Sequence, residues 1–338
     1  MACSVALAAL PHQIFHRLGA APHQMMRKAA PPPAEHGVLL SDFDWIGDLG
    51  SGGFARVSKV RHRRSGAVFA LKVSRDADPS TEEGEEAEVL RRAAGSPHVV
   101  ACHALLRGAA SEPAACVLEF MDAGCLRSVL RRRRALGRGA GAGIPEPALA
   151  EVAAHCAEGL AQLHSLGVAH LDVKPDNFLT NSNGEVKIAD FNTSKIFYGG
   201  GGGAGERRVL AVPITDGTSC YFSPERFAPG ARAGPSGAMA ADVWGLGVTV
   251  LELFLGRFVV SPKLSDAELE LAICHGRHLR VPEEAEASAE LRDFVAACLE
   301  REPARRATVP QLLAHPFLAR RDVEASRRAL REIIVETL

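Results

Sequence analysis

The chain lacks the cysteine patterns that bind zinc or build a disulfide framework. Its 338 residues include eight cysteines, scattered without a Cys-x-x-Cys pair. Structural zinc sites need closely spaced thiolate or imidazole ligands. Disulfide frameworks are typical of short secreted chains with several cysteines at characteristic spacings. The spacing argues against both classes and favours a reducing compartment. We therefore expect a cytoplasmic location, with the nucleus as an addition.

An excess of one charge is also missing. The chain has 39 Lys and Arg against 40 Asp and Glu, which gives a formal net charge of −1. Without a net field, nothing draws the whole chain toward nucleic acid or an anionic membrane. We expect no nucleic-acid partner. A local basic run, Arg131 to Arg134, is either a solvated helix end or a docking surface for an acidic partner.

Long hydrophobic runs are absent as well. The best apolar stretch, Gly247 to Leu255, is short and contains Glu252, so we expect no membrane span. The first 34 residues contain no acidic residue, as in organelle transit peptides, but Ser4 is their only hydroxyl residue. We expect a disordered tail over residues 1–43 instead.

What is present is two regions with different patterns. From Asp44 to Met121 the signals are mostly strand-like, including the apolar run Val68–Val73, with one acidic helix expected over Thr81–Ala94. Beyond Met121 the pattern is helical, and Asn183-Gly184 marks a hairpin. Helices are predicted at 146–166, 241–255, 266–274, 288–299 and from Asp322 onward. The composition of the two regions predicts an α+β fold with a ligand cleft between them.

A glycine-rich segment follows the first predicted strand. It consists of Leu49, Gly50, Ser51, Gly52, Gly53, Phe54, Ala55, Arg56 and Val57. Glycines let a backbone approach phosphate oxygens closely, which makes this a candidate nucleotide-binding loop. Ala55 stands where G-x-G-x-x-G has its third glycine, and no Gly-Lys-Ser/Thr follows, so the segment is not a Walker loop.

Lys72 lies 15 residues after Val57, inside the apolar run. One interpretation is an edge lysine whose ammonium reaches solvent. The other is a lysine that faces the cleft and binds the α- and β-phosphates of a nucleotide as a point charge. Such a lysine needs an acidic partner, and among the glutamates of the predicted helix we expect Glu86 to be that partner.

Five further motifs occur in a fixed order. They are His170-Leu171-Asp172-Val173-Lys174-Pro175-Asp176-Asn177, Asp190-Phe191-Asn192, Ser223-Pro224-Glu225, Asp242-Val243-Trp244-Gly245-Leu246-Gly247 and Arg306. Together with the glycine-rich segment and Lys72, this set resembles the eukaryotic protein kinases from about Asp44 to Leu318. The resemblance implies a bilobal kinase domain at 44–318. A small β-rich N-lobe with one main helix spans 44–121, a larger α-helical C-lobe spans 122–318, and a helical tail follows at 319–338.

The resemblance also implies residue roles. Asp172 would accept or orient the proton of the substrate hydroxyl, and Lys174 would lie near the γ-phosphate. Asn177 and Asp190 would be oxygen ligands of Mg²⁺. Lys72, held by Glu86, would bind the α- and β-phosphates. The implied cofactors are ATP and Mg²⁺.

Adenine would be bound by the segment between the lobes. The backbones of Glu119 and Met121 resemble the hinge that contacts the adenine ring, behind Leu118. Val57 and Ala70 would cover the ring. Asp242 and a Glu225–Arg306 pair would brace the loops without reacting.

A finer resemblance rests on Ser223-Pro224-Glu225-Arg226 with Lys187-Ile188-Ala189-Asp190. These are similar to mitogen-activated protein kinase kinases, most of all the plant ones. That resemblance implies a monomer that phosphorylates Thr and Tyr of a downstream mitogen-activated protein kinase. An upstream kinase would be a further partner. Two alternatives stay open, namely a pseudokinase scaffold for cascade partners and an active Ser/Thr kinase of another subfamily.

Three departures from the family pattern bear on regulation. Leu171 replaces the Arg that in the family pairs with a phosphorylated residue, and Asn192 replaces a glycine. The expected phosphosites fall on Ile214 and on Leu210 or Arg208, and Thr215 is the only hydroxyl residue nearby before Gly217. We therefore predict that switching does not use the usual dual phosphorylation. The retained polar groups, Lys72, Asp172, Asn177 and Asp190, favour an active enzyme over the scaffold.

Overall fold

The computed structural model describes residues 38–51, 55–74, 84–106, 115–137, 143–198 and 211–338. Most of the predicted tail, residues 1–37, lies outside these ranges. The end of that tail differs from the prediction, because Leu40–Asp42 form a helical turn and the first strand begins at Phe43. Phe43 is only 7% exposed, so burial of its ring explains why the ordered fold starts before Asp44.

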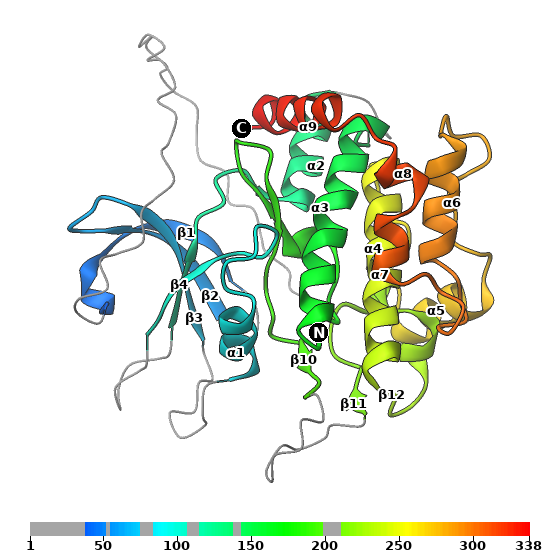
Figure 1. Ribbon diagram of the computed structural model, residues 1–338, viewed down its shortest axis with the longest axis horizontal. Helices are drawn as coiled ribbons and strands as arrows, with labels where there is room; N and C mark the ends of the chain where they lie inside the picture. Colours follow the sequence, from blue (N-terminus) through cyan, green and yellow to red (C-terminus); the bar gives the residue numbers. More distant parts are fainter. Residues whose placement is uncertain (1–37, 52–54, 75–83, 107–114, 138–142, 199–210) are drawn as a thin grey trace. The chain divides into compact units, whose positions relative to one another are not determined.

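An antiparallel sheet and one helix form the N-terminal part (Figure 1). These elements are β1 Phe43–Ser51, β2 Ala55–His62, β3 Val68–Ser74, α1 Glu85–Arg92, β4 Cys102–Leu106 and β5 Ala115–Glu119. The strands lie in the order β1-β2-β3-β5-β4. Val60, Phe69 and Val117 pack together on one face, while Cys116 and Leu118 of β5 pack into the cluster that includes α1. This alternation places Lys72 of β3 on the α1 side.

The remaining described elements are mainly helical. The helices are α2 Leu126–Ala135, α3 Glu146–Ser165, α4 Pro235–Leu255, α5 Asp266–Glu270, α6 Ala289–Cys298, α7 Val309–Leu313, α8 Pro316–Ala319 and α9 Val323–Glu336. Short strands pair as β6 Gly124–Cys125 with β8 Phe178–Thr180 and β9 Val186–Ile188, as β7 Val168–Ala169 with β10 Lys195–Ile196, and as β11 Val212–Pro213 with β12 Arg232–Ala233. The α+β class that the sequence predicts is thus confirmed.

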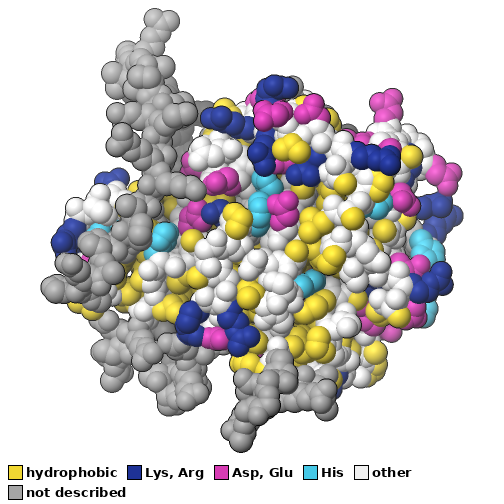
Figure 2. Space-filling view, viewed as in Figure 1, with side chains coloured by type: hydrophobic (Ala, Val, Ile, Leu, Met, Phe, Trp, Pro, Cys, Tyr) yellow, Lys and Arg dark blue, Asp and Glu magenta, His cyan; other side chains and the backbone are white. Residues whose placement is uncertain are grey.

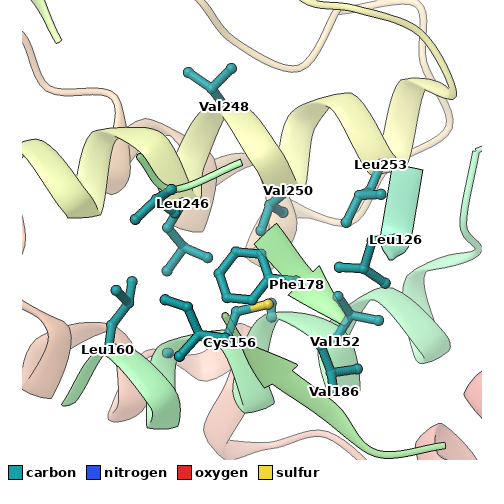
Figure 3. Packing of buried hydrophobic residues seen from close by; sticks show 14 of the residues in the cluster. Leu126, Val152, Cys156, Leu160, Phe178, Val186, Leu246, Val248, Val250 and Leu253 are labelled. Atoms are coloured by element: carbon teal, nitrogen blue, oxygen red, sulfur yellow. The ribbon is translucent and has the colours of Figure 1, made fainter. Parts of the chain in front are cut away.

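The core of the helical part lies between α3 and α4. Figure 3 shows Phe178 of β8 among Val152 and Cys156 of α3 and Leu246 and Val250 of α4. These side chains are almost fully buried. Because β8 carries Phe178 into this core, the residues just before it, including the motif 170–177, are fixed on a rigid base.

The apolar helix α4 begins earlier than predicted, at Pro235, a residue type that suits the first turn of a helix. Among the described residues it is the one helix that is long and apolar enough to cross a membrane, but 78% of its most apolar stretch is buried inside the protein. Its apolar surface is therefore covered by neighbouring elements of the same chain.

The tail helix α9 packs on α3 and is the red helix in Figure 1. Its anchor is the fully buried Glu151, whose carboxylate accepts Arg321 Nε at 2.8 Å and Arg327 Nε at 3.0 Å. Burial alone would raise the pKa of Glu151, but His155 and the two arginines lower it to about 2. On the face shown in Figure 2, acidic and basic side chains are mixed over this helix.

Backbone bonds tie the two parts together beside the predicted site. Val100 N donates to Ile188 O at 2.9 Å, and Ile188 N donates to His98 O at 2.9 Å. Ile188 is the last residue of β9 and lies two residues before Asp190. The segment that joins α1 to β4 is therefore fastened to the strand that positions Asp190.

Candidate active site

Lys72 lies between two carboxylates. Its Nζ is 2.5 Å from Glu86 Oε1 and 2.9 Å from Asp190 Oδ1. The side chain is 7% exposed, which rules out the interpretation of a lysine that reaches solvent. Burial alone would lower the pKa of Lys72, but Glu86 and Asp190 raise it above its ordinary value. Lys72 is therefore a fixed cation on the central strand of the sheet.

The other glutamates near Lys72 have different partners. Glu85 pairs with Lys195 at 3.0 Å, and Glu88 pairs with Arg92 at 2.7 Å. Glu82 and Glu83 lie outside the described residues. The helix α1 thus presents Glu86 to Lys72, as the sequence led us to expect.

Asp172 is the centre of a second polar cluster. Its Oδ2 accepts Lys174 Nζ at 2.6 Å and Asn177 Nδ2 at 3.1 Å, and its Oδ1 accepts Thr218 N at 2.9 Å. Burial alone would raise the pKa of Asp172, but Lys174 above all lowers it below the usual value. Asp172 is therefore a carboxylate at neutral pH, ready to accept a hydrogen bond from a hydroxyl group.

Asn177 and Asp190 have oxygens suited to a magnesium ion. The amide nitrogen of Asn177 donates to Asp172 O at 2.9 Å, which fixes the side chain and turns its oxygen the other way. Asp190 gives Oδ1 to Lys72 and is 45% exposed, so its second oxygen can serve another ligand. Mg²⁺ prefers a few protein oxygens combined with phosphate and water oxygens. These two residues therefore fit the metal that the sequence predicts.

Apolar side chains form the surface on which an adenine ring would lie. Met121 packs with Val100 and Ala189, and Leu118 and Leu179 pack against that cluster. Val57 and Ala70 lie on β2 and β3 beside Lys72. Leu179, the second residue of β8, was not predicted from the motifs, although an aliphatic residue so soon after Asn177 could have been recognised as a floor for the ring.

Glu119 has a structural bond as well as its place in the hinge. Its carboxylate pairs with Lys187 at 2.7 Å, and its amide donates to Ala101 O at 2.9 Å. The carboxylate is thus already engaged, so any contact of Glu119 with adenine would come from its backbone. The carbonyl of Met121 accepts the amide of Gly124 at 3.1 Å, which closes a turn immediately after the hinge.

The glycine-rich segment joins β1 to β2. Leu49, Gly50 and Ser51 lie at the end of β1, while Ala55, Arg56 and Val57 begin β2. Gly52, Gly53 and Phe54 lie outside the described residues. A Cβ added at Gly50 would meet no neighbouring atom, so packing does not require glycine there. Arg56 is held at the surface by Asp48, with Nη2 2.8 Å from Oδ2.

The buried Asp242 braces the loop that carries Asp172. It accepts the backbone amides of His170 at 2.8 Å and Leu171 at 2.7 Å, and His164 Nε2 lies 2.9 Å from the same carboxylate. A second brace joins Glu225 to Arg306, with Oε1 and Nη1 2.8 Å apart. Both have the bracing contacts that the sequence predicts for them.

The three departures occupy different environments. Leu171 has a left-handed φ of +64° and is 2% exposed, and Ile214 is also 2% exposed. Asn192, by contrast, is exposed. Among the described non-glycine residues only Leu171 and Asp190 have positive φ, so Asn192 does not adopt the left-handed conformation that glycine would permit there. The unusual backbone conformation lies two residues earlier, at Asp190.

Comparisons with known proteins agree with this geometry. The family model for the protein kinase domain matches residues 43–318. Mitogen-activated protein kinase kinase 9 of Arabidopsis thaliana is 38% identical over 289 residues, covering 84% of this chain and 86% of the relative. Mitogen-activated protein kinase kinase 7 of the same plant is 38% identical over 293 residues, covering 85% of this chain and 88% of the relative. Mitogen-activated protein kinase kinase 10 of Arabidopsis thaliana is 34% identical over 321 residues, covering 92% of this chain and 95% of the relative.

Proposed function

The chain belongs to the protein kinase family and, within it, to the mitogen-activated protein kinase kinases, and we propose that it transfers the γ-phosphate of ATP to a downstream mitogen-activated protein kinase. The observation that carries this proposal is the joint presence of two assembled polar clusters, Lys72–Glu86–Asp190 and Asp172–Lys174–Asn177. A chain that only bound partners would not need either cluster.

The two clusters divide the work of phosphoryl transfer. Lys72 would hold the α- and β-phosphates, since it is a buried cation whose position Glu86 fixes. Asn177 and Asp190 would hold Mg²⁺, which when bound neutralises charge on the phosphates. Asp172 would orient the substrate hydroxyl and accept its proton at a carboxylate oxygen. Positioning and electrostatics, rather than covalent chemistry, supply the rate enhancement in this class of reaction.

Lys174 connects the catalytic carboxylate to the segment that would receive the substrate. Its Nζ lies 2.6 Å from Asp172 Oδ2 and 2.6 Å from Thr218 Oγ1. Lys174 at this position, with Thr218 after Gly217, resembles Ser/Thr-directed kinases, which supports Ser and Thr hydroxyls as acceptors. The names of the relatives support a mitogen-activated protein kinase as substrate. The family resemblance implies Thr and Tyr of one loop as the acceptors.

Transfer of radiolabelled γ-phosphate to a catalytically inactive plant mitogen-activated protein kinase tests the proposal. We expect the full-length wild type to label that protein, and the variants Lys72→Met and Asp172→Asn to give only background. Equal background from all three proteins, while the partner still binds, would contradict the proposal and favour a scaffold. Efficient transfer without preference for a Thr-x-Tyr loop would instead indicate another Ser/Thr subfamily.

A further inference from the structure

The residue beside the catalytic aspartate is aliphatic and lies in an apolar cluster. Leu171 packs with Phe197, Val212 and Ile214. The cluster is completed by the small side chains Ala169, Ala231, Ala238 and Ala241. We call this set the 171/214 cluster. It joins the loop that carries Asp172 to the segment 211–218, which lies about forty residues further along the chain.

A guanidinium group reaches the same junction from a third segment. Arg226 donates from Nε to Ile214 O at 2.6 Å, from Nη1 to Leu171 O at 2.9 Å, and from Nη2 to Asp216 O. Its guanidinium carbon also lies 3.7 Å from the centre of the Phe222 ring. Arg226 therefore bonds the backbones of both loops at once, with all three nitrogens engaged.

Burial lowers the pKa of Arg226 to about 10, although Asp242 and Asp172 act in the opposite direction. The group is still a cation at neutral pH. A charged donor makes stronger hydrogen bonds to carbonyl oxygens than a neutral one does. The junction thus contains a fixed positive charge that comes from outside the catalytic loop.

The position of the segment 211–218 affects Asp172 directly. The amide of Thr218 donates to Asp172 Oδ1 at 2.9 Å. Gly217 has a φ of +124°, and a Cβ there would lie 2.8 Å from Leu171 O. The two backbones therefore meet closely beside the reactive carboxylate, and a shift of the segment would move one of its hydrogen-bond donors.

Resting on the proposed function, we propose that Leu171, Ile214 and Arg226 are positioning residues that hold the segment 211–218 against Asp172 without any phosphate group. Two observations support this assignment. Thr215 is the hydroxyl residue next to the expected phosphosite position Ile214. Its side chain is exposed and does not belong to the 171/214 cluster. The nitrogens of Arg226 are bonded to carbonyls, so a phosphate would have to displace those bonds to reach this cation.

The test uses full-length protein freed of phosphate by a phosphatase that is then removed. We expect treated and mock-treated wild type to have the same kcat. Ile214→Ala should lower kcat by about tenfold or more, because a small misplacement of reacting groups is enough for such a loss. The KM for ATP should change by less than about threefold, since Lys72 and Glu86 are untouched. Ile214→Val should restore most of the rate, and Thr215→Ala should match wild type.

Hydrogen exchange gives a second measurement that does not depend on activity. We expect the amides of Val212, Ile214 and Thr218 to be protected in treated wild type and in Thr215→Ala. In Ile214→Ala they should exchange at least about tenfold faster, a larger increase than that of amides in α3 and α4. A wild type that loses kcat or amide protection after phosphatase treatment would overturn the proposal. An Ile214→Ala variant with the kcat and the amide protection of wild type would also overturn it. A wild type without transfer activity but with the expected exchange pattern would contradict the proposed function and leave the positioning role supported.

Discussion

The two sides of Asp172 are held by different kinds of interaction. On the nucleotide side the interactions are ion pairs, because Lys72 lies between the carboxylates of Glu86 and Asp190. On the side of the segment 211–218, the 171/214 cluster is apolar, and the buried cation beside it, Arg226, bonds to backbone carbonyls. The charged residues of the first side follow the family pattern, whereas two of the departures, Leu171 and Ile214, belong to the second side.

The contrast shows which roles need a particular chemical group. A phosphate and a metal ion carry charge, so the side chains that bind them must carry charge or oxygen donors. Holding two backbones together requires only a close fit, and aliphatic packing can supply that as well as an ion pair can. Leu171 and Ile214 therefore show a change in how the segment is held, while the catalytic groups themselves remain.

The largest expected effect comes from removing a charge that acts directly on the reacting groups. Lys72→Met or Asp172→Asn should lower kcat by roughly 10²–10⁴-fold while the protein stays folded, because each removes a group that acts on the reacting phosphate or hydroxyl. Steady-state transfer to the inactive mitogen-activated protein kinase measures this.

A neighbouring ion pair provides the matched control. Lys195 and Glu85 form a pair of the same residue types, 3.0 Å apart and more exposed. Lys195→Met should change kcat by less than about twofold, since exposed pairs contribute little. A loss of kcat as large as that of Lys72→Met would show that the rate responds to the loss of any ion pair in this region. It would not then reflect loss of the group that binds the phosphates.

Restoring the family residue should weaken the protein. Leu171→Arg buries a second cation beside Arg226 in an apolar cluster, and the carboxylates of Asp172 and Asp242 close by already have hydrogen-bond partners. We expect the free energy of unfolding to fall by on the order of 3 kcal/mol, with a parallel loss of kcat. Denaturant unfolding and transfer assays measure both. A variant as stable and active as wild type would mean that the junction accepts charge and that the contrast between the two sides is not real.

Truncating Arg226 should have a smaller effect on stability. Arg226→Met leaves buried carbonyls of both loops without a donor, which we expect to cost about 1–3 kcal/mol and to lower kcat. Arg232→Met is the matched control, because Arg232 also donates to a carbonyl, that of Ala211, but is exposed. Equal losses in the two variants would remove Arg226 from the positioning role.

Glu151 provides the smallest expected effect on catalysis, since it is a buried charge remote from the chemistry. Its pKa lies at about 2, below the ordinary 4.5, so its carboxylate stabilises the fold above pH 4.5 and loses that contribution as the pH falls toward 2. Relative to Glu151→Gln, wild type should be more stable by on the order of 2 kcal/mol at pH 7, and this advantage should disappear near pH 2. At neutral pH kcat should be nearly the same for both. A stability difference independent of pH would contradict the expected role of charge at this anchor.

Residues whose chemistry is fixed by the ligand could be found from the sequence. Glu86 could be selected for Lys72 because a buried lysine needs one carboxylate at a set place on the following helix. The loop around Asp172 could be found because acid, lysine and amide occur at a characteristic spacing. These residues are close in sequence or joined by a strong electrostatic requirement.

The junction of the 171/214 cluster could not be found in this way. Arg226 and Ile214 meet Leu171 only after the chain has returned over more than forty residues, and nothing in their spacing fixes that contact. The positive φ of Asp190 could not be predicted either, since backbone angles depend on packing as well as residue type. The helix expected over 266–274 also changes partway, because Leu271–His275 form a wider π-helical turn.

One measurement tests the central claim most directly, namely that Asp172 is held ready for catalysis without phosphate on its own chain. It is the rate of γ-phosphate transfer to a catalytically inactive plant mitogen-activated protein kinase by phosphatase-treated full-length protein, beside Lys72→Met treated in the same way. We expect the treated wild type to transfer phosphate at the rate of the untreated protein, and Lys72→Met to give background. A treated wild type that falls to the level of Lys72→Met, while the untreated protein stays active, would contradict the claim.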